Sequence, residues 1–344
     1  MNKNSVFRHQ HSGILSLAAV EAPRVVTSDW IDEQLAETYQ RNGLRPGLLA
    51  GLAGIEERRW WDDDVSFTDA AAMAGRAAIE QAGIDPSKIG ILISTSVCKE
   101  NLEPSVACAV HHQLGLSTSC LNFDIANACL GFINAMHLAA TMLDAGTVEY
   151  ALIVDGEGSR YTQQTTLERL RDPNSTAGDV FAEFASLTLG SGAAAMVMAR
   201  TELVPDAPRY RGGVTRSATE WNQLCRGNLD RMVTDTRMLL IEGLKLAQKT
   251  FVAAREALGW AVDELDQFVI HQVSQPHTAA FIKNFGIDPK KVMTIFGEHG
   301  NIGPASVPIV LSKLKELGRL KKGDRIALLG IGSGLNCSMA EVVW

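Results

Sequence analysis

The residue best suited to covalent chemistry in this sequence is Cys129, which lies within the stretch LNFDIANACLGFINAMHLAATMLDAG at 121–146. The first residues of this stretch alternate between apolar and polar side chains, as in a short strand, and residues 129–143 have helical spacing. Unpaired N–H groups at a helix start favour a thiolate and lower the pKa of a cysteine. The sequence therefore predicts a nucleophilic thiolate at Cys129, with a small buried turn residue as the alternative.

Two further candidates come from an internal repeat. Similar segments near residues 90, 121 and 150 recur in the same order near residues 267, 292 and 325. The repeat places His271 at the end of a buried strand and Asn301 in the turn HGNIGPAS, so we expect both to meet Cys129 at one centre. Taken alone, His271 is equally compatible with a core histidine, and Asn301 with an ordinary turn residue.

The repeat also predicts the fold class. Two similar α/β halves with long buried helices between strands favour a layered α/β fold, in which helices lie between and around two sheets. We place the first half at residues 1–208, with a polar insertion at about 156–186. The second half is then residues 209–344 and carries His271 and Asn301.

Together these residues resemble the active-site motifs of the thiolase superfamily, and within it those of the ketoacyl synthase III branch. The matching motifs are Ala128-Cys129-Leu130-Gly131-Phe132, His271-Gln272, His299-Gly300-Asn301-Ile302-Gly303-Pro304-Ala305-Ser306, the glycine-rich loop Gly332-Ser333-Gly334 and the dimer-interface motif Pro104-Ser105-Val106-Ala107-Cys108. This resemblance covers nearly the whole chain and implies a thiolase-like αβαβα fold.

The resemblance implies a role for each site residue. Cys129 is expected to carry the first acyl group as a thioester, which keeps its carbonyl electrophilic. His271 and Asn301 are expected to donate hydrogen bonds to the enolate oxygen of the second substrate. Backbone N–H groups of Cys129 and Ser333 are expected to stabilise the other oxyanion. Ser274 replaces an asparagine of many relatives and is expected to contact the pantetheine of the substrate.

Glu103 distinguishes the subfamilies. Typical ketoacyl synthase III enzymes decarboxylate a malonyl group, need no base and carry an apolar residue before the PSxAC motif, where this chain has Glu103. The chain is most similar to the branch that joins two long-chain fatty acyl-CoA molecules in bacterial olefin synthesis. In that branch a glutamate of the partner subunit removes the α-proton. The alternative for Glu103 is a solvated carboxylate at a helix start.

The resemblance thus implies a homodimeric acyltransferase that performs a non-decarboxylative Claisen condensation. Its 2-alkyl-3-ketoacyl product is expected to be released as the β-keto acid and passed to downstream pathway enzymes. Two other functions stay open: a 3-oxoacyl-ACP synthase III that condenses acyl-CoA with malonyl-ACP, and a non-catalytic scaffold subunit of the same fold. The retained Cys129 argues against the scaffold, because such subunits usually lose the nucleophile.

Composition and charge argue against several other classes of protein. A net charge of -7 argues against binding of nucleic acid or an anionic membrane. The sequence contains no transmembrane segment and no pattern resembling a signal peptide, so we expect a cytoplasmic protein. The six cysteines show no metal-ligand or disulfide spacing, so we expect no metal and no cofactor besides the coenzyme A of the substrates.

The remaining local patterns predict individual elements. The predictions are one helix at 28–39 capped by Ser28, a surface turn or ligand-entrance rim at 58–61, a helix with Pro104 near its first turn, an edge strand within 187–200, and a basic segment at 226–237 that either reaches phosphates or is a solvated loop.

Overall fold

A mixed β-sheet runs through the centre of the protein, whose computed structural model describes residues 5–344. Its strand order is β12-β13-β14-β9-β2-β8-β7-β5-β6, with β1 paired to β9. The strands are β1 (Val6–Arg8), β2 (Ser12–Glu21), β5 (Ile89–Ser94), β6 (Leu121–Asp124), β7 (Tyr150–Glu157), β8 (Gly192–Arg200), β9 (Arg209–Ser217), β12 (Gln267–Ile270), β13 (Arg325–Gly332) and β14 (Asn336–Val343).

The sheet consists of two halves, and its path crosses from one to the other at the pair Gly13 and Arg209. In the first half β2, β8 and β7 are antiparallel neighbours, and β5 follows β7 in parallel. In the second half β9, β14 and β13 repeat this antiparallel order, and β12 follows β13 in parallel. The strand order thus reproduces the repeat seen in the sequence. Whether the segments 1–208 and 209–344 are separate domains stays a prediction.

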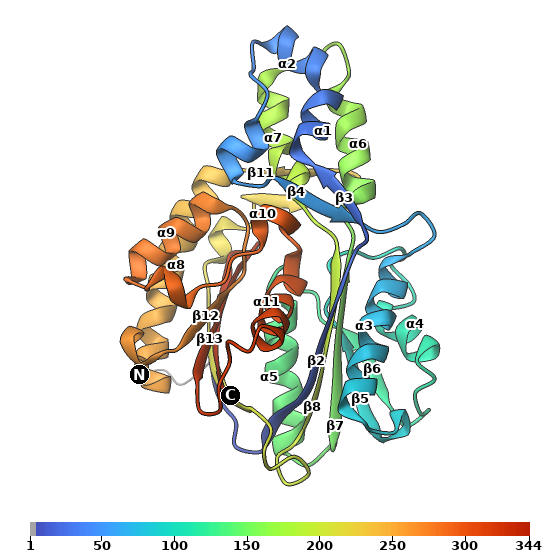
Figure 1. Cartoon of the computed structure of the whole chain (residues 1–344), viewed down its shortest axis with the longest axis vertical. Helices are drawn as coiled ribbons and strands as arrows, with labels where there is room; N and C mark the ends of the chain where they lie inside the picture. Colours follow the sequence, from blue (N-terminus) through green and yellow to red (C-terminus); the bar gives the residue numbers. More distant parts are fainter. Residues whose placement is uncertain (1–4) are drawn as a thin grey trace.

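Helices form three layers around the two half-sheets (Figure 1). One pair lies between the half-sheets, and one pair covers the outer face of each. The inner pair is α5 (Gly131–Asp144) and α11 (Ser306–Glu316), and the outer pairs are α3 (Phe67–Ala82) with α4 (Val106–Gln113) and α8 (Thr236–Leu258) with α9 (Gln275–Phe285). Side chains of the inner helices, such as Phe132 and Val310, are buried in the core between the half-sheets. This is the layered αβαβα arrangement that the sequence predicts.

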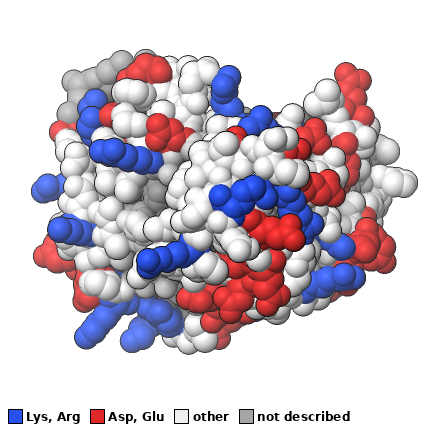
Figure 2. All heavy atoms as spheres, turned by 90° about the horizontal axis from the view of Figure 1, so that it is seen from above, with Lys and Arg blue, Asp and Glu red and all other residues white. Residues whose placement is uncertain are grey.

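The segment predicted as an insertion forms two helices at one end of the molecule (Figure 1). These helices pack beside two others from the N-terminal region and above a two-stranded sheet. The elements of this head are α1 (Ser28–Gln34), α2 (Ala36–Asn42), α6 (Arg160–Leu170), α7 (Ala177–Leu187), β3 (Arg24–Thr27) and β4 (Glu57–Trp60). Figure 2, which looks onto this end, shows acidic and basic side chains next to one another rather than one continuous basic surface. No helix formed by residues 5–344 is long and apolar enough to cross a bilayer.

The helix predicted from residue 28 begins there, but its cap and its length are wrong. The expected helix at 28–39 is interrupted at Leu35, and its N-cap is Thr27, whose hydroxyl accepts a hydrogen bond from the Trp30 N–H at 3.1 Å. Pro104 lies near the first turn of α4, as expected, directly before the capping residue Ser105.

The interpretations of segments 58–61 and 187–200 are also wrong. β4 pairs with β3, and Arg58 is fully buried in the head, where its guanidinium donates to the carbonyls of Val26 and Leu187. The segment is therefore part of a core and not a surface turn or an entrance rim. β8, the strand of segment 187–200, lies between β2 and β7 and is not an edge strand.

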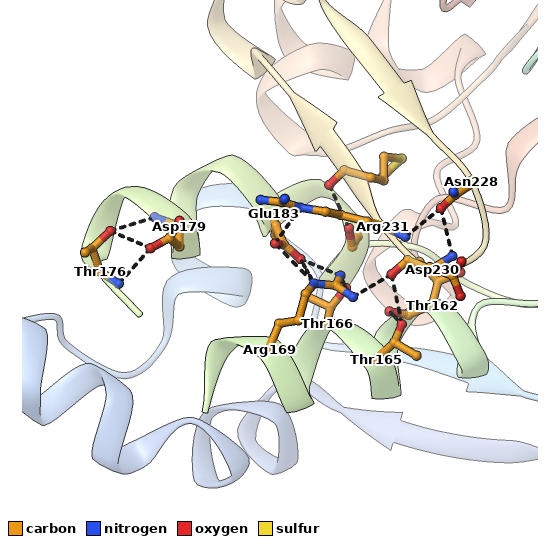
Figure 3. A network of polar contacts seen from close by, with 12 residues as sticks. Thr162, Thr165, Thr166, Arg169, Thr176, Asp179, Glu183, Asn228, Asp230 and Arg231 are labelled. Carbon is orange, nitrogen blue, oxygen red and sulfur yellow. Dashed lines mark hydrogen bonds and ion pairs between the residues drawn. The ribbon is translucent and has the colours of Figure 1, made fainter. Parts of the chain in front are cut away.

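A polar network fastens the head to a short hairpin formed by β10 (Cys225–Gly227) and β11 (Met232–Thr234) (Figure 3). The buried Glu183 carboxylate of α7 accepts hydrogen bonds from Arg169 of α6, at 2.6 and 3.0 Å, and from Arg231 of the hairpin turn, at 3.0 Å. Carbonyls of the hairpin turn accept further hydrogen bonds from Thr162, Thr165 and Arg169. Arg231, one of the basic residues at 226–237, is thus engaged by the head; a phosphate contact for the others stays a prediction.

Removing the Glu183 carboxylate tests this connection. Glu183→Ala leaves two guanidinium groups without their shared acceptor, so we expect the free energy of unfolding to fall by roughly 1 to 3 kcal/mol. Urea denaturation measures this change. Glu168→Ala, on the exposed face of α6, is the matched control and is expected to change stability by less than about 0.5 kcal/mol. Equal stability of both variants would contradict the proposed importance of the network.

His137 of α5 is a buried histidine in the layer between the half-sheets. Its Nδ1 shares a hydrogen bond of 2.8 Å with the Tyr210 hydroxyl, and Ser338 lies at 3.4 Å from its Nε2. Burial lowers the pKa of His137 to about 3. The folded protein therefore holds this side chain neutral over the whole range in which a solvated histidine titrates.

This burial makes folding stability depend on pH. The unfolded chain binds the proton near pH 6.5 and the folded chain only near pH 3, so the contribution of His137 is complete above pH 6.5 and is lost as the pH falls. Between pH 6.5 and 5 the expected loss is about 1.5 kcal/mol of unfolding free energy. His137→Asn removes the titration, so urea denaturation at these two pH values is expected to give a smaller loss for the variant. Equal losses of unfolding free energy in the native protein and the variant would refute the assignment of this pH dependence to His137.

Candidate active site

Cys129 lies in the connection between β6 and α5, two residues before the helix begins at Gly131. The preceding residue, Ala128, has φ 44°, a left-handed conformation that is uncommon for a residue with a side chain. The turn is closed by a hydrogen bond of 3.0 Å from the Leu130 N–H to the Asn127 carbonyl. The turn therefore fixes Cys129 beside the start of α5, and the prediction that Cys129 is itself the first helical residue is wrong.

The environment of Cys129 favours the thiol over the thiolate. Burial raises the pKa of the Cys129 thiol to about 12, and the nearby Cys225 and Glu157 act in the same direction. The expectation of a lowered pKa is therefore wrong, because desolvation outweighs the helix start. The resting nucleophile carries its proton and must transfer it when it attacks.

His271 follows β12 directly, where its backbone N–H donates to the Leu329 carbonyl of β13 at 2.7 Å. The ring is buried, and neither ring nitrogen has a hydrogen-bond partner among residues 5–344. Burial lowers the pKa of His271 to about 4, so the imidazole is neutral near pH 7. A neutral imidazole with two unpaired nitrogens is able to donate one hydrogen bond and to accept one proton.

Asn301 lies in the loop after α10 (Phe296–His299), and a close backbone approach fixes its position. The Gly190 N–H donates to the Asn301 carbonyl at 2.8 Å, and a Cβ atom at Gly190 would lie 1.8 Å from the His299 carbonyl oxygen. The side-chain oxygen of Asn301 accepts a hydrogen bond from the Gly303 N–H at 3.0 Å. This bond orients the amide and leaves its NH₂ group available as a donor.

Gly303 links the asparagine loop to the other site residues. Its backbone lies beside the His271 ring, and a Cβ atom in its place would be 3.6 Å from the carboxyl carbon of Glu157. Glu157 in turn lies close enough to Cys129 to raise the pKa of its thiol. Gly303 thus lies beside both the His271 ring and Glu157, and Glu157 lies near Cys129. The meeting of Cys129, His271 and Asn301 at one centre stays a prediction.

The glycine-rich loop approaches Cys129 from the second half of the chain. A Cβ atom at Gly332 would lie 3.4 Å from the Cys129 backbone nitrogen, so the end of β13 touches the turn that holds the thiol. Ser333 is the next residue and follows β13 directly. Its expected backbone contribution to an oxyanion site stays a prediction.

An apolar cavity of about 60 Å³ adjoins His271 between α8 and α9. Its walls include Leu240, Leu244 and Phe281, and its polar lining residues include His277 and Thr278, whose Nε2 and Oγ1 atoms have no partner within residues 5–344. The cavity therefore combines an apolar wall with unpaired polar atoms, and its volume is well below the roughly 300 to 1,000 Å³ of a site that holds a whole ligand.

Ser274 lies near this cavity, and its hydroxyl is 2.8 Å from Nδ1 of His277, which lines the wall. The hydroxyl is therefore already engaged within the chain. A contact of Ser274 with pantetheine stays a prediction.

Glu103 lies on the surface, in the segment between β5 and α4. It forms no hydrogen bond or ion pair with any residue from 5 to 344, and its neighbour Leu102 is 99% exposed. Within one chain Glu103 is thus not engaged by any other residue of the candidate site.

Sequence reasoning missed Glu157, which ends β7 and is 5% exposed. Burial raises its pKa to about 7, and the adjacent Asp155 is also buried with a raised pKa. The signal was present in the strand YALIVDGE, where two carboxylates end a run of apolar residues. Acidic residues are seldom fully buried without a specific partner, so this pattern marks a special environment.

Comparison with known proteins identifies the family. Residues 58–183 match the thiolase N-terminal domain, and residues 255–344 match the 3-oxoacyl-[acyl-carrier-protein (ACP)] synthase III C-terminal domain. An acyl-CoA:acyl-CoA alkyltransferase of Xanthomonas campestris pv. campestris is 68% identical over 335 residues, which cover 97% of this chain and 99% of that protein. One from Shewanella oneidensis is 33% identical over 344 residues, which cover 96% and 98%.

Solved structures agree with these relatives. A crystal structure of Xanthomonas campestris OleA with bound lauric acid and lauroyl-CoA matches with a TM-score of 0.96 and 67% identity, over 97% of this chain and 99% of that one. The predicted thiolase-like fold and the resemblance to the ketoacyl synthase III branch are confirmed. The chain is an acyltransferase of the thiolase superfamily and belongs to the acyl-CoA:acyl-CoA alkyltransferase family, and it is similar to solved structures of OleA.

Proposed function

We propose that this enzyme joins two long-chain fatty acyl-CoA molecules by a non-decarboxylative Claisen condensation. The observation that carries the proposal is the pair formed by a neutral His271 with unpaired nitrogens and an Asn301 whose amide oxygen is already occupied. Two such donors suit the developing charge of an enolate in a site of low dielectric. The names of the curated relatives support acyl-CoA as both substrates.

The first half-reaction loads Cys129. The Cys129 thiol attacks the thioester carbonyl and passes its proton to His271, which is neutral and able to accept it. The bond between the carbonyl carbon and the coenzyme A sulfur breaks, and coenzyme A leaves as the thiol with that proton. Backbone N–H groups of Cys129 and Ser333 stabilise the tetrahedral oxyanion.

The second half-reaction forms the carbon–carbon bond. Glu103 of the partner subunit removes an α-proton from the second acyl-CoA, and His271 and Asn301 donate hydrogen bonds to the enolate oxygen. The α-carbon attacks the acyl group on Cys129, and the carbon–sulfur bond to the enzyme breaks. The proton taken up by Glu103 passes through solvent to the Cys129 sulfur, which restores the thiol and the base. Water then hydrolyses the 2-alkyl-3-ketoacyl-CoA to coenzyme A and the β-keto acid, which downstream enzymes use.

A homodimer supports the role of Glu103. β6 is the last strand in the sheet order, and no strand formed by residues 5–344 pairs with its outer edge, on which Leu121 is half exposed. An exposed edge strand with apolar side chains favours pairing with another chain. We propose that a second copy pairs at this edge, which places the exposed Leu102 in an interface and Glu103 in the partner's site. The six free cysteines are in keeping with a cytoplasmic location.

Turnover of a single substrate tests the proposal. With myristoyl-CoA alone, the purified enzyme is expected to release coenzyme A and to form a long β-keto acid or the ketone from its decarboxylation, both followed by mass spectrometry. Cys129→Ala is expected to abolish both. Glu103→Gln is expected to keep acylation of Cys129 but to lower condensation by about 10² to 10⁴, because proton abstraction is lost.

Asn101→Ala, at an exposed position in the same segment, is the matched control and is expected to retain activity. Condensation that occurs only with malonyl-ACP would replace the proposal by a 3-oxoacyl-ACP synthase III. Binding of acyl-CoA without any adduct on Cys129 would favour the scaffold. Undiminished condensation by Glu103→Gln would refute the assigned base.

A further inference from the structure

The buried carboxylate of Glu157 holds the backbone that leads to Glu103. Its Oε1 accepts a hydrogen bond from the Val97 N–H at 2.6 Å, and its Oε2 accepts one from the Cys98 N–H at 3.3 Å. Both donors lie just beyond the end of β5, where the segment to α4 begins. Hydrogen bonds from backbone N–H groups to a buried carboxylate are among the stronger ones in proteins, so this contact fixes the start of the segment.

Glu157 is the last of a series of contacts that continue the sheet beyond its final backbone pair. The Thr95 N–H donates to the Val154 carbonyl at 2.9 Å, and the Gly156 N–H donates to the Ser96 hydroxyl at 2.9 Å. The Thr95 hydroxyl also bonds to the carboxylate of Asp155. Hydrogen bonds thus link residues 95–98, which follow β5, to residues 154–157 of β7. The bonds made by Glu157 are those nearest to Glu103 along the chain.

The tip of this segment, residues 101–104, is positioned by hydrogen bonds of the residues on either side of it. Within residues 5–344, no hydrogen bond engages positions 101–104, which include Glu103. On the near side, Lys99 pairs with Asp124 at 2.6 Å and Glu100 accepts from the Phe67 N–H at 2.6 Å. On the far side, the first turn of α4 is held by Asp124. The direction in which Glu103 projects is therefore set by the residues that hold the two ends of the tip.

The other side of Glu157 faces the active site of its own chain. Its carboxyl carbon is the nearest group to the missing Cβ of Gly303, and it contributes to the raised pKa of the Cys129 thiol. The titratable groups around it are the buried Asp155 and the partly buried Cys98, both with raised pKa values, and Cys129. Glu157 thus stands between the thiol that accepts an acyl group and the segment that carries the base.

We infer that Glu157 is a positioning residue for Glu103, so that its contribution to condensation appears in the active site of the partner subunit and not in its own. The inference rests on the proposed function, in which Glu103 acts across a homodimer. The amide oxygen of a glutamine accepts hydrogen bonds without the negative charge, and its NH₂ cannot accept one, so Glu157→Gln weakens the hold on the two backbone donors. A base displaced by about 1 Å lowers a rate by about 100-fold.

Mixed dimers with two different affinity tags separate the two sites. In the first dimer, one chain carries Cys129→Ala and the other carries Glu157→Gln. The remaining thiol then belongs to the Glu157→Gln chain and receives its base from a chain with native Glu157. In the second dimer, one chain carries both substitutions and the other is native. The remaining thiol is then native but receives its base from the chain that lacks the Glu157 carboxylate.

The reference is a dimer of a Cys129→Ala chain with a native chain, assayed with myristoyl-CoA. We expect condensation in the second dimer to fall by about 10- to 100-fold, while acylation of its Cys129, followed by intact mass, is retained. Glu157→Gln also changes the surroundings of Cys129 in its own chain, so the condensation rate of each dimer is divided by its rate of Cys129 acylation. By this ratio the first dimer is expected to stay within twofold of the reference. Loss in the first dimer alone, equal loss in both, or loss in neither would overturn the inference.

A further dimer separates failure of this inference from failure of the proposed function. It combines a chain carrying Cys129→Ala and Glu103→Gln with a native chain, and it is expected to lose condensation. Retained condensation there, or a protein that proves to be monomeric, would remove the base acting across subunits and the inference with it. If Glu157→Gln chains do not fold, Glu157→Asp serves in the same dimers, because it keeps the charge and withdraws the carboxylate by one methylene.

Discussion

Direct backbone contact between the two halves of the chain is the constraint on which the candidate site depends. At Gly190 a single added carbon would lie 1.8 Å from the His299 carbonyl oxygen, and the loop bearing Asn301 would have to move. The contacts at Gly332 and Gly303 are looser, since an added carbon would lie 3.4 Å from the Cys129 nitrogen and 3.6 Å from the carboxyl carbon of Glu157. Because no side chains separate these segments, loops that are distant in the sequence are able to present their donors to one small volume.

The same close packing keeps water out and holds the reacting groups uncharged. Burial raises the pKa of Cys129 and lowers that of His271, so the resting pair is a thiol and a neutral imidazole. Charge then arises only as the reaction proceeds. A donor fixed in a medium of low dielectric stabilises such transient charge more strongly than a solvated donor does. The arrangement thus favours the anionic stages of a condensation over an ionised resting state.

Sequence patterns predicted well what depends on neighbouring residues. The repeated order of strands needed no tertiary information, and the motifs around Cys129 and Asn301 indicated the family. The wrong predictions concern features that depend on contacts between distant segments of the chain. The burial of Arg58 follows from its packing between β3 and α7, and the pKa of Cys129 follows from neighbours such as Glu157 on another strand. Neither contact leaves a periodic signal in the sequence.

The hydrogen bonds between the hairpin and the head limit how the sequence of such a chain is able to change during evolution. The insertion at 156–186 supplies Glu183 and Arg169, while their partner Arg231 comes from the second half of the chain. Removal of the insertion would leave the hairpin turn without the side chains that donate hydrogen bonds to it and without the Glu183 carboxylate that accepts from it. The insertion therefore cannot be lost or exchanged alone. Length changes in these two segments should accompany each other, so the helices of the head and the hairpin below them form one evolutionary unit.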